Sequence, residues 1–339
     1  MRVPSNVPRR AAMGLVLVAG FGLTAVATEV LTRAITRALG DCHPLCVTKY
    51  DPTLGWTLAE NTVGRHRHDE LGIDVQYRID ANGAREFEGN RSAAGPHRVL
   101  VLGDSNGFGW GIASGRTFSA RLQRTSGLEV INLSVSGYGT DQELLRFRAE
   151  HARLRPALVV VQVTPNDFDD IQMSWVAGRP KPWFTLESGT LRSHNIPVDI
   201  EPHDSHRLVG HPFPVGLRAW LLRHSYTYHW LNERWRANHP RTPVRQRFSV
   251  GAVALFRALI NDVRATATGS GAIVGVVHAS PEIQRRVTEA IPLGVDVLDL
   301  SHRFEAEGGA LFSDDLHWND QGHRIAAEAL TEWVGSRSR

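Results

Sequence analysis

Cysteine is scarce in this 339-residue chain, and no run of like charges occurs anywhere in it. Two cysteines, Cys42 and Cys46, exclude a disulfide-rich scaffold and lack the two further ligands that a structural zinc site needs. In an oxidising compartment they could form one small disulfide loop. The net charge of +3 is scattered, so no nucleic-acid partner is expected. A hydrophobic content of 42% is enough for a folded core, so a folded rather than a disordered chain is expected.

An uncharged apolar segment, residues 11–28, follows a cationic start that contains Arg9 and Arg10. About 18 residues at a helical rise of about 1.5 Å just cross the hydrocarbon core of a bilayer. We therefore predict a single-pass membrane anchor with a cytoplasmic N-terminus. The alternative is a signal peptide cleaved at the small-x-small stretch of residues 25–27. Both interpretations place the rest of the chain in the periplasm or outside the cell.

Changes in composition and hydrophobic pattern divide the chain into three parts. Residues 1–40 hold the tail and the anchor or signal segment, 41–97 form an extended, turn-rich prelude, and 98–336 form the main domain. A Pro-, His- and Trp-rich stretch at about 169–249 interrupts that domain as an insertion. Its tryptophans could stack on sugar rings or cover an acyl chain, although such residues more often pack an insertion onto its domain.

The main domain alternates short apolar runs with stretches of helical spacing. The apolar runs, expected to be strands buried on both faces, are 99–102, 130–133, 158–163, 273–277 and 295–300. The expected helices are 117–125, 141–154, 250–267 and 321–334. Strands that alternate with helices predict a parallel sheet with helices on both sides, an α/β/α three-layer fold of the flavodoxin-like kind.

A serine between glycines follows the first predicted strand, in the sequence GDSNGFG at residues 103–109. The carboxyl ends of parallel strands are where such sheets bind ligands, and flanking glycines allow a substrate to approach. Ser105 therefore becomes a candidate nucleophile if a base can take its proton. GxSxG also fits the nucleophile elbow of α/β-hydrolases, but here the serine follows the first strand of the domain, which argues against that fold.

The candidate base lies near the other end of the domain, in the sequence DDLHWNDQGH at residues 314–323. Asp314 precedes His317 by three residues, so the carboxylate could bind one ring nitrogen and leave the other facing a serine. Spacing alone leaves His323 as a rival base and Asp315 as a rival acid. Asn319 or Asp320 could in addition cap the final helix.

Two more polar loops follow the second and third predicted strands. The sequence SVSGYG contains Gly137 at a flexible turn with backbone N–H groups, and TPND contains Asn166 with a side-chain amide. Acyl transfer places negative charge on the former carbonyl oxygen, and each well-placed donor there is worth about 3 to 4 kcal/mol. The four loops together predict a site for acyl transfer.

These loops resemble the SGNH/GDSL hydrolase family, which is named for Ser, Gly, Asn and His in four sequence blocks. GDSNGFG with Ser105 matches the first block, INLSVSGYG with Gly137 the second, and DDLH with Asp314 and His317 the last. The third block departs, because the family usually has Gly-x-Asn-Asp where this chain has TPND with Asn166. The resemblance covers about residues 98–336 apart from the insertion.

The resemblance implies a role for each of these residues. Ser105 would be the nucleophile, His317 the general base and Asp314 the residue that orients the histidine. The N–H groups of Ser105 and Gly137 and the amide of Asn166 would form the oxyanion hole. The reaction would pass through an acyl-enzyme and needs no cofactor. No metal is expected either, because a His-x-His pair such as residues 66 and 68 in a polar loop is usually only solvated.

The expected function is serine-dependent ester hydrolysis, with an acyl ester as the substrate partner and the membrane as the second partner through the N-terminal helix. Family members with a similar anchor and prelude look like enzymes that edit acetyl groups on surface polysaccharides, so a carbohydrate-linked acetyl ester is one expected substrate, and lipid or thioester substrates are the alternatives. An O-acyltransferase with the same serine, histidine and aspartate is the alternative. A non-catalytic glycan-binding module is disfavoured, because all four catalytic residue types are present.

Overall fold

The computed structural model describes residues 7–39, 47–87, 98–176, 179–198, 217, 220–221, 225–228, 230–231, 250–313 and 316–337. Cys42, Cys46, Asp314 and Asp315 lie outside these residues, and so does most of the predicted insertion. The predicted disulfide loop and the predicted acid partner of His317 therefore stay predictions.

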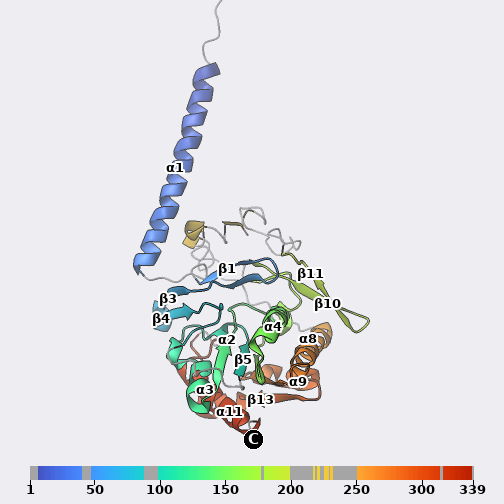
Figure 1. Cartoon of the computed structure of the whole chain (residues 1–339). Helices are drawn as coiled ribbons and strands as arrows, with labels where there is room; N and C mark the ends of the chain where they lie inside the picture. The colour runs from blue at the N-terminus through green and yellow to red at the C-terminus, as the bar shows by residue number, and fades with distance from the viewer. Residues whose placement is uncertain are drawn as a thin grey trace, which may run out of the picture.

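The N-terminal segment forms one long helix, α1 (Val7–Leu39), that extends away from the folded domain (Figure 1). Within it, Ala12–Ile35 has a mean hydropathy of 1.9 and none of this window is buried in the protein. A helix of this length and composition is consistent with a membrane anchor or with a signal peptide.

Five parallel strands form the central sheet, and each overlaps a strand predicted from the sequence. In chain order they are β5 (Arg98–Leu102), β6 (Glu129–Asn132), β7 (Leu158–Gln162), β12 (Ile273–His278) and β13 (Val295–Asp299). The order across the sheet is β13-β12-β7-β5-β6. Leu100 on β5 pairs with Ile131 on β6 and with Val159 on β7, which places β5 inside the sheet. The predicted α/β fold with five parallel strands is confirmed.

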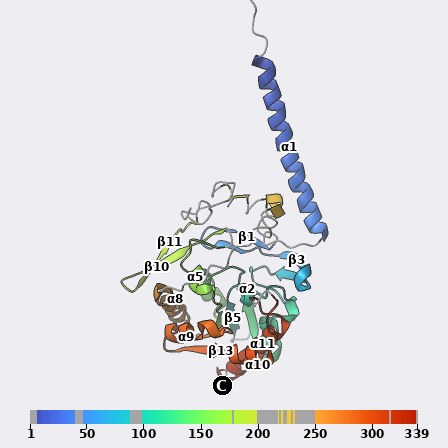
Figure 2. The ribbon, with the colours of Figure 1, turned by 180° about the vertical axis from the view of Figure 1, so that it is seen from behind.

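Helices cover both faces of this sheet (Figures 1 and 2). One apolar core lies beneath α4 (Thr140–Leu154), α8 (Val250–Thr268) and α9 (Pro281–Ala290). A second core lies beneath α3 (Phe118–Ser126), α10 (Ser301–Glu307) and α11 (Asp320–Arg337). The helices α9, with ten residues, and α10, with seven, were not predicted from the sequence.

The remaining elements are short. The prelude contains β1 (Thr48–Asp51), β2 (Gly55–Leu58), β3 (Thr62–His68), the 3-10 turn η2 (Asp69–Leu71) and β4 (Ile73–Ile79). Loops of the sheet domain contain α2 (Ser105–Phe108), η3 (Ser114–Arg116) and α5 (Asp167–Asp170). After α5 come β8 (Trp175–Val176), β9 (Arg179–Pro180), β10 (Trp183–Glu187) and β11 (Thr190–His194). Strands β1 with β2, β3 with β4, β8 with β9 and β10 with β11 form antiparallel pairs.

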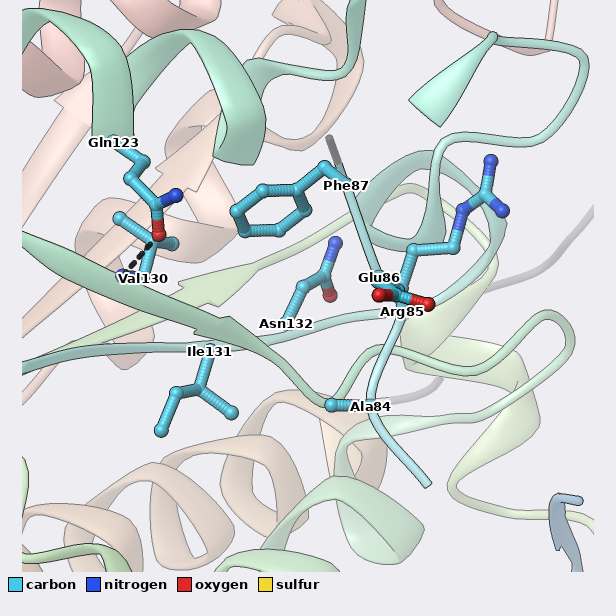
Figure 3. Close-up of a pocket in the computed structure, with 8 residues that line it drawn as sticks. All are labelled: Ala84, Arg85, Glu86, Phe87, Gln123, Val130, Ile131 and Asn132. Atoms are coloured by element: carbon cyan, nitrogen blue, oxygen red, sulfur yellow. Dashed lines mark hydrogen bonds between the residues drawn. The ribbon is translucent and has the colours of Figure 1, made fainter. Parts of the chain in front are cut away.

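The prelude is attached to the exposed edge of the sheet through Arg85. Its N–H donates to the carbonyl of Asn132 at 2.9 Å, which gives the edge strand β6 an antiparallel partner there. A cavity of about 50 Å³ beside this contact lies among Phe87, Gln123 and Val130 (Figure 3). Small-molecule sites enclose about 300 to 1,000 Å³, so this cavity is a packing void at the junction.

Candidate active site

Ser105 is the first residue of α2, three residues beyond the end of β5. Asp104 caps this short helix, since its carboxylate accepts the N–H of Asn106 at 2.8 Å. The flanking glycines are required by close packing. A Cβ atom on Gly107 would lie 2.5 Å from the hydroxyl oxygen of Ser134. A Cβ atom on Gly103 would lie 2.8 Å from the side-chain oxygen of Gln162 on β7. The serine turn is therefore pressed against the ends of β6 and β7.

His317 lies directly opposite this serine. Its Nε2 is 3.1 Å from the hydroxyl oxygen of Ser105, although 212 positions separate the two residues in the chain. The loop that carries His317 folds back on itself, since Leu311 pairs with Trp318 and the N–H of Phe312 donates to the carbonyl of His317 at 2.9 Å. The structure thus brings together the predicted nucleophile and the predicted base within hydrogen-bonding distance.

Asn106 connects the serine turn to the histidine loop, a role that the sequence analysis missed. Its side-chain oxygen accepts the N–H of Trp318 at 2.7 Å, and its side-chain nitrogen donates to the carbonyl of Leu316 at 3.2 Å. These two backbone groups flank His317 on both sides. Because Asn106 follows Ser105 directly and is buried, any displacement of the histidine loop from the serine must break both hydrogen bonds. The sequence signal was present in the polar residue after the serine, but its partner lay 210 positions away.

His323, the rival base, is packed in the core of the domain instead. The ring is fully buried, its Nδ1 accepts the N–H of Phe118 at 3.1 Å, and it is stacked on the Phe118 ring with centroids 5.6 Å apart. Burial lowers the pKa of His323 to about 3, so the ring is neutral and holds the start of α3 against α11. The rival acid Asp315 lies outside the described residues, as does Asp314.

Two of the three predicted oxyanion donors lie beside the same cavity. Ser105 and Asn166 both line a cavity of about 560 Å³ together with His317. The side-chain nitrogen of Asn166 donates to Asp170 at 2.8 Å, and its oxygen accepts the hydroxyl of Thr164 at 2.6 Å. Asn166 also has a side-chain hydrogen bond to the carboxyl group of Asp104, so its amide is held between two acidic side chains beside the cavity. Gly137 is absent from the described lining of this cavity, and its φ of +82° favours glycine.

The remaining walls of the cavity are largely apolar. Its volume lies within the range of small-molecule sites. Apart from Ser105, His317 and Asn166, the lining residues are Asn106, Val163, Thr164, Pro165, Ala279, Ser280, Pro281, Glu282, Leu311, Leu316 and Trp318. This cavity can therefore hold an apolar acyl group next to the serine, with polar groups at Ser280 and Glu282 for the remainder of an ester.

Thr164 stands where the family pattern usually has glycine, and its hydroxyl is hydrogen-bonded to the site. This hydroxyl lies 2.6 Å from a carboxylate oxygen of Asp104 and 2.6 Å from the amide oxygen of Asn166. One hydroxyl proton cannot serve both acceptors. Burial raises the pKa of Asp104, and a protonated Asp104 would supply the second proton. Threonine at this position therefore joins Asp104, which caps α2, to Asn166, a predicted oxyanion donor.

Behind the serine turn lies a group of buried carboxyl groups with one buried lysine among the described residues. The members are Asp104, Asp141, Glu143, Asp167, Asp170 and Lys181. Burial raises the pKa of Asp167 and of Glu143 well above the ordinary range, and the neighbouring carboxylates raise both further. Lys181 forms an ion pair with Asp141 and donates to the backbone carbonyl of Asp170 at 2.9 Å. Through Asp170, which accepts the side-chain N–H of Asn166, this group holds the loop that carries Asn166.

Asp170→Asn should change how stability depends on pH. Burial raises the pKa of Asp170 from its ordinary 3.8 to about 7. Between about pH 4 and 7 the unfolded wild-type chain has lost this proton while the folded chain keeps it, so wild-type stability falls as the pH rises. The variant has no such proton. Its free energy of unfolding relative to wild type should therefore increase across this window in urea titrations and stay constant above it, whereas a difference independent of pH would contradict the assignment.

An α/β/α fold with a serine and a histidine facing each other beside a cavity is an arrangement that suits ester hydrolysis. Residues 101–325 of the 339 match the model of the GDSL-like lipase/acylhydrolase family, and the chain belongs to that family. It is therefore an esterase or acylhydrolase of the SGNH/GDSL type. No curated protein matches the chain.

Several solved structures are similar to the chain at low identity. The lipase/acylhydrolase from Enterococcus faecalis is 13% identical, with a TM-score of 0.40, over 71% of this chain and 96% of that one. The psychrotrophic esterase EstA from Pseudoalteromonas is 13% identical, with a TM-score of 0.39, over 71% and 97%. A two-domain esterase active on acetylated mannans is 12% identical, with a TM-score of 0.37, over 71% of this chain and 49% of that one.

Proposed function

We propose that Ser105 is the nucleophile and His317 the general base of this esterase, with Asp314 orienting the histidine. The observation that carries the proposal is the 3.1 Å separation of the Ser105 hydroxyl and His317 Nε2 beside a substrate-sized cavity. A serine hydroxyl needs such a base to become nucleophilic. The N–H groups of Ser105 and Gly137 and the amide of Asn166 serve as the oxyanion donors.

In the proposed cycle the hydroxyl oxygen of Ser105 attacks the ester carbonyl carbon while its proton passes to His317 Nε2. The tetrahedral intermediate collapses, and the leaving alkoxide takes that proton as it departs, which leaves an acyl group on Ser105. Water then attacks the acyl carbon and gives a proton to His317. The acid is released, and the proton returns to the oxygen of Ser105.

Within this class we propose an acetyl or other short acyl ester carried on a surface carbohydrate as the substrate. Support comes from the cavity beside the serine, whose lining includes the apolar residues Pro165, Leu311 and Leu316, whereas Ser280 and Glu282 offer hydrogen bonds to a polyol. A chain-length series of aryl esters tests the acyl part, and we expect the highest kcat/KM for acetate. A steady rise to octanoate or longer would instead point to a lipid substrate.

A glycan acceptor distinguishes hydrolysis from O-acyl transfer at the same site. We expect the purified enzyme to release acetate from an acetylated glycan faster than it moves acetyl groups from an aryl acetate to a deacetylated glycan. Both products can be quantified in one reaction, as free acetate and as glycan-bound acetyl. Glycan acetylation that outpaces acetate release would make the protein an O-acyltransferase.

We further propose that α1 anchors the protein in the cell membrane with the catalytic domain outside the cytoplasm. Support comes from the 24 residues of Ala12–Ile35, which at about 1.5 Å per residue reach across a bilayer core. Near the end of this stretch, Glu29 accepts hydrogen bonds from the Ser225 hydroxyl at 2.7 Å and the Tyr226 N–H at 2.9 Å. These contacts join the C-terminal part of α1 to residues 225 and 226. Carbonate-washed membranes should retain the full-length chain, and release of a chain shortened near residue 27 would instead reveal a cleaved signal peptide.

A further inference from the structure

The ring of Trp110 is stacked on the ring of His317. The ring centroids are 4.1 Å apart and the planes differ by 26°. Trp110 lies just after α2, in the turn that leads away from the nucleophile. Its backbone N–H donates to the backbone carbonyl of Ser105 at 2.9 Å. It is absent from the described lining of the cavity beside Ser105. Trp110 thus contacts the base from a side that the acyl group does not occupy.

The prelude holds this tryptophan in place. The ring of His66 on β3 lies 4.8 Å from the ring of Trp110, with the planes at 60°. The Nδ1 of His66 is 2.6 Å from the hydroxyl of Tyr77 on β4, and that hydroxyl accepts the N–H of Gly111 at 2.8 Å. The hairpin of β3 and β4 therefore contacts the tryptophan ring through His66, and it binds the next residue in the chain, Gly111, through Tyr77.

His66 is neutral in this arrangement. Burial lowers the pKa of His66 to about 4, with smaller contributions from His68 and His317. Because the Tyr77 hydroxyl accepts from Gly111, its own proton is free to be donated to Nδ1 of His66, which suits a neutral imidazole. No positive charge from His66 then opposes a second charge on His317.

We propose that Trp110 is a positioning residue for the general base, and that its ring face stabilises the imidazolium form of His317 during acyl transfer. The face of an indole carries partial negative charge and attracts a cation within about 6 Å of the ring. His317 becomes such a cation when it takes the proton of Ser105. The charge exists only along the reaction path, so the contact stabilises the transition state more than the ground state. The stack also restricts rotation of the imidazole away from the serine.

The test compares two replacements of Trp110 in the full-length, detergent-solubilised enzyme. Trp110→Phe keeps an aromatic face, whereas Trp110→Leu fills part of the space without one. We expect kcat for an aryl acetate to fall roughly 10-fold in Trp110→Leu and less than about 3-fold in Trp110→Phe, with KM nearly unchanged in both. Should the leucine variant fail to fold, Trp110→Met takes its place in the comparison.

Trp183 provides a matched control, because it forms the same kind of stack on β10, which lies apart from α2 (Figures 1 and 2). Its ring lies 4.2 Å from that of His194, with the planes at 19°. Trp183→Leu should leave kcat within about 2-fold of wild type. Equal activity of Trp110→Leu and Trp110→Phe, or a change in KM with kcat preserved, would overturn the inference. The inference rests on the proposed role of His317, which is tested separately: wild-type activity in His317→Gln would reject that role.

Discussion

Ser105→Ala is expected to abolish ester hydrolysis, with kcat for an aryl acetate reduced by roughly 10⁴-fold or more. The hydroxyl oxygen of Ser105 is the atom placed 3.1 Å from His317 Nε2, and alanine offers no atom to attack the carbonyl carbon. Residual turnover should reflect only substrate binding and polarisation of the carbonyl. The substitution removes one partly exposed oxygen, so the midpoint of thermal unfolding should stay close to that of wild type.

Fluorophosphonate labelling identifies the nucleophile directly. The probe should modify wild-type enzyme at Ser105 and leave Ser105→Ala unlabelled. Ser280→Ala is the matched control, because Ser280 lines the same cavity and its replacement should preserve labelling. His317→Gln should be labelled far more slowly, since Ser105 then lacks its base. Unchanged turnover in Ser105→Ala, or a probe attached to another serine, would reject the assignment.

Asn106→Ala is expected to lower kcat by roughly 10²-fold, although its side chain is not part of the proposed reaction. The amide holds the carbonyl of Leu316 and the N–H of Trp318, at 3.2 Å and 2.7 Å, on either side of His317. Without these contacts the histidine loop can shift relative to the serine. A displacement of about 1 Å is enough for a loss of this size. The two backbone groups also lose their partners, so the unfolding free energy should fall by about 1 to 3 kcal/mol.

Asn106→Asp separates the two hydrogen bonds. A carboxylate still accepts the N–H of Trp318 but cannot donate to the carbonyl of Leu316, so its activity should lie between those of wild type and Asn106→Ala. Steady-state kinetics and fluorophosphonate labelling rates measure the effect. Ser105 keeps its oxygen in both variants, so labelling should slow but still reach completion. Wild-type kcat in Asn106→Ala would show that the histidine loop is held by other contacts.

The sheet domain was predictable because each strand carries a local signal. Five apolar runs without polar alternation indicate strands buried on both faces, and β5, β6, β7, β12 and β13 overlap all five. General rules for strands joined by helices limit the possible strand orders, and the structure shows which one occurs, β13-β12-β7-β5-β6. The prelude was recognised only as extended and rich in turns. Its attachment to the sheet edge through Arg85 depends on a contact with Asn132, and no local sequence pattern predicts that contact.

The choice of base illustrates what local spacing leaves open. His317 and His323 lie in the same ten-residue stretch, and either could serve a serine on grounds of spacing. In the folded chain His323 is buried against Phe118, whereas His317 faces Ser105. Six residues of separation place the two rings in different environments, because the loop ends and α11 begins between them.

The sequence by itself determined the α/β class, the apolar N-terminal helix, and the residue types of the site, because buried strands, apolar segments and glycine-flanked serines have local signatures. Only the tertiary structure decided that His317 meets Ser105, that Asn106 holds the histidine loop, and that the prelude supports Trp110. Such contacts join segments up to about two hundred positions apart. They depend on how loops pack at the ends of strands, where side-chain geometry rather than periodicity selects the partner.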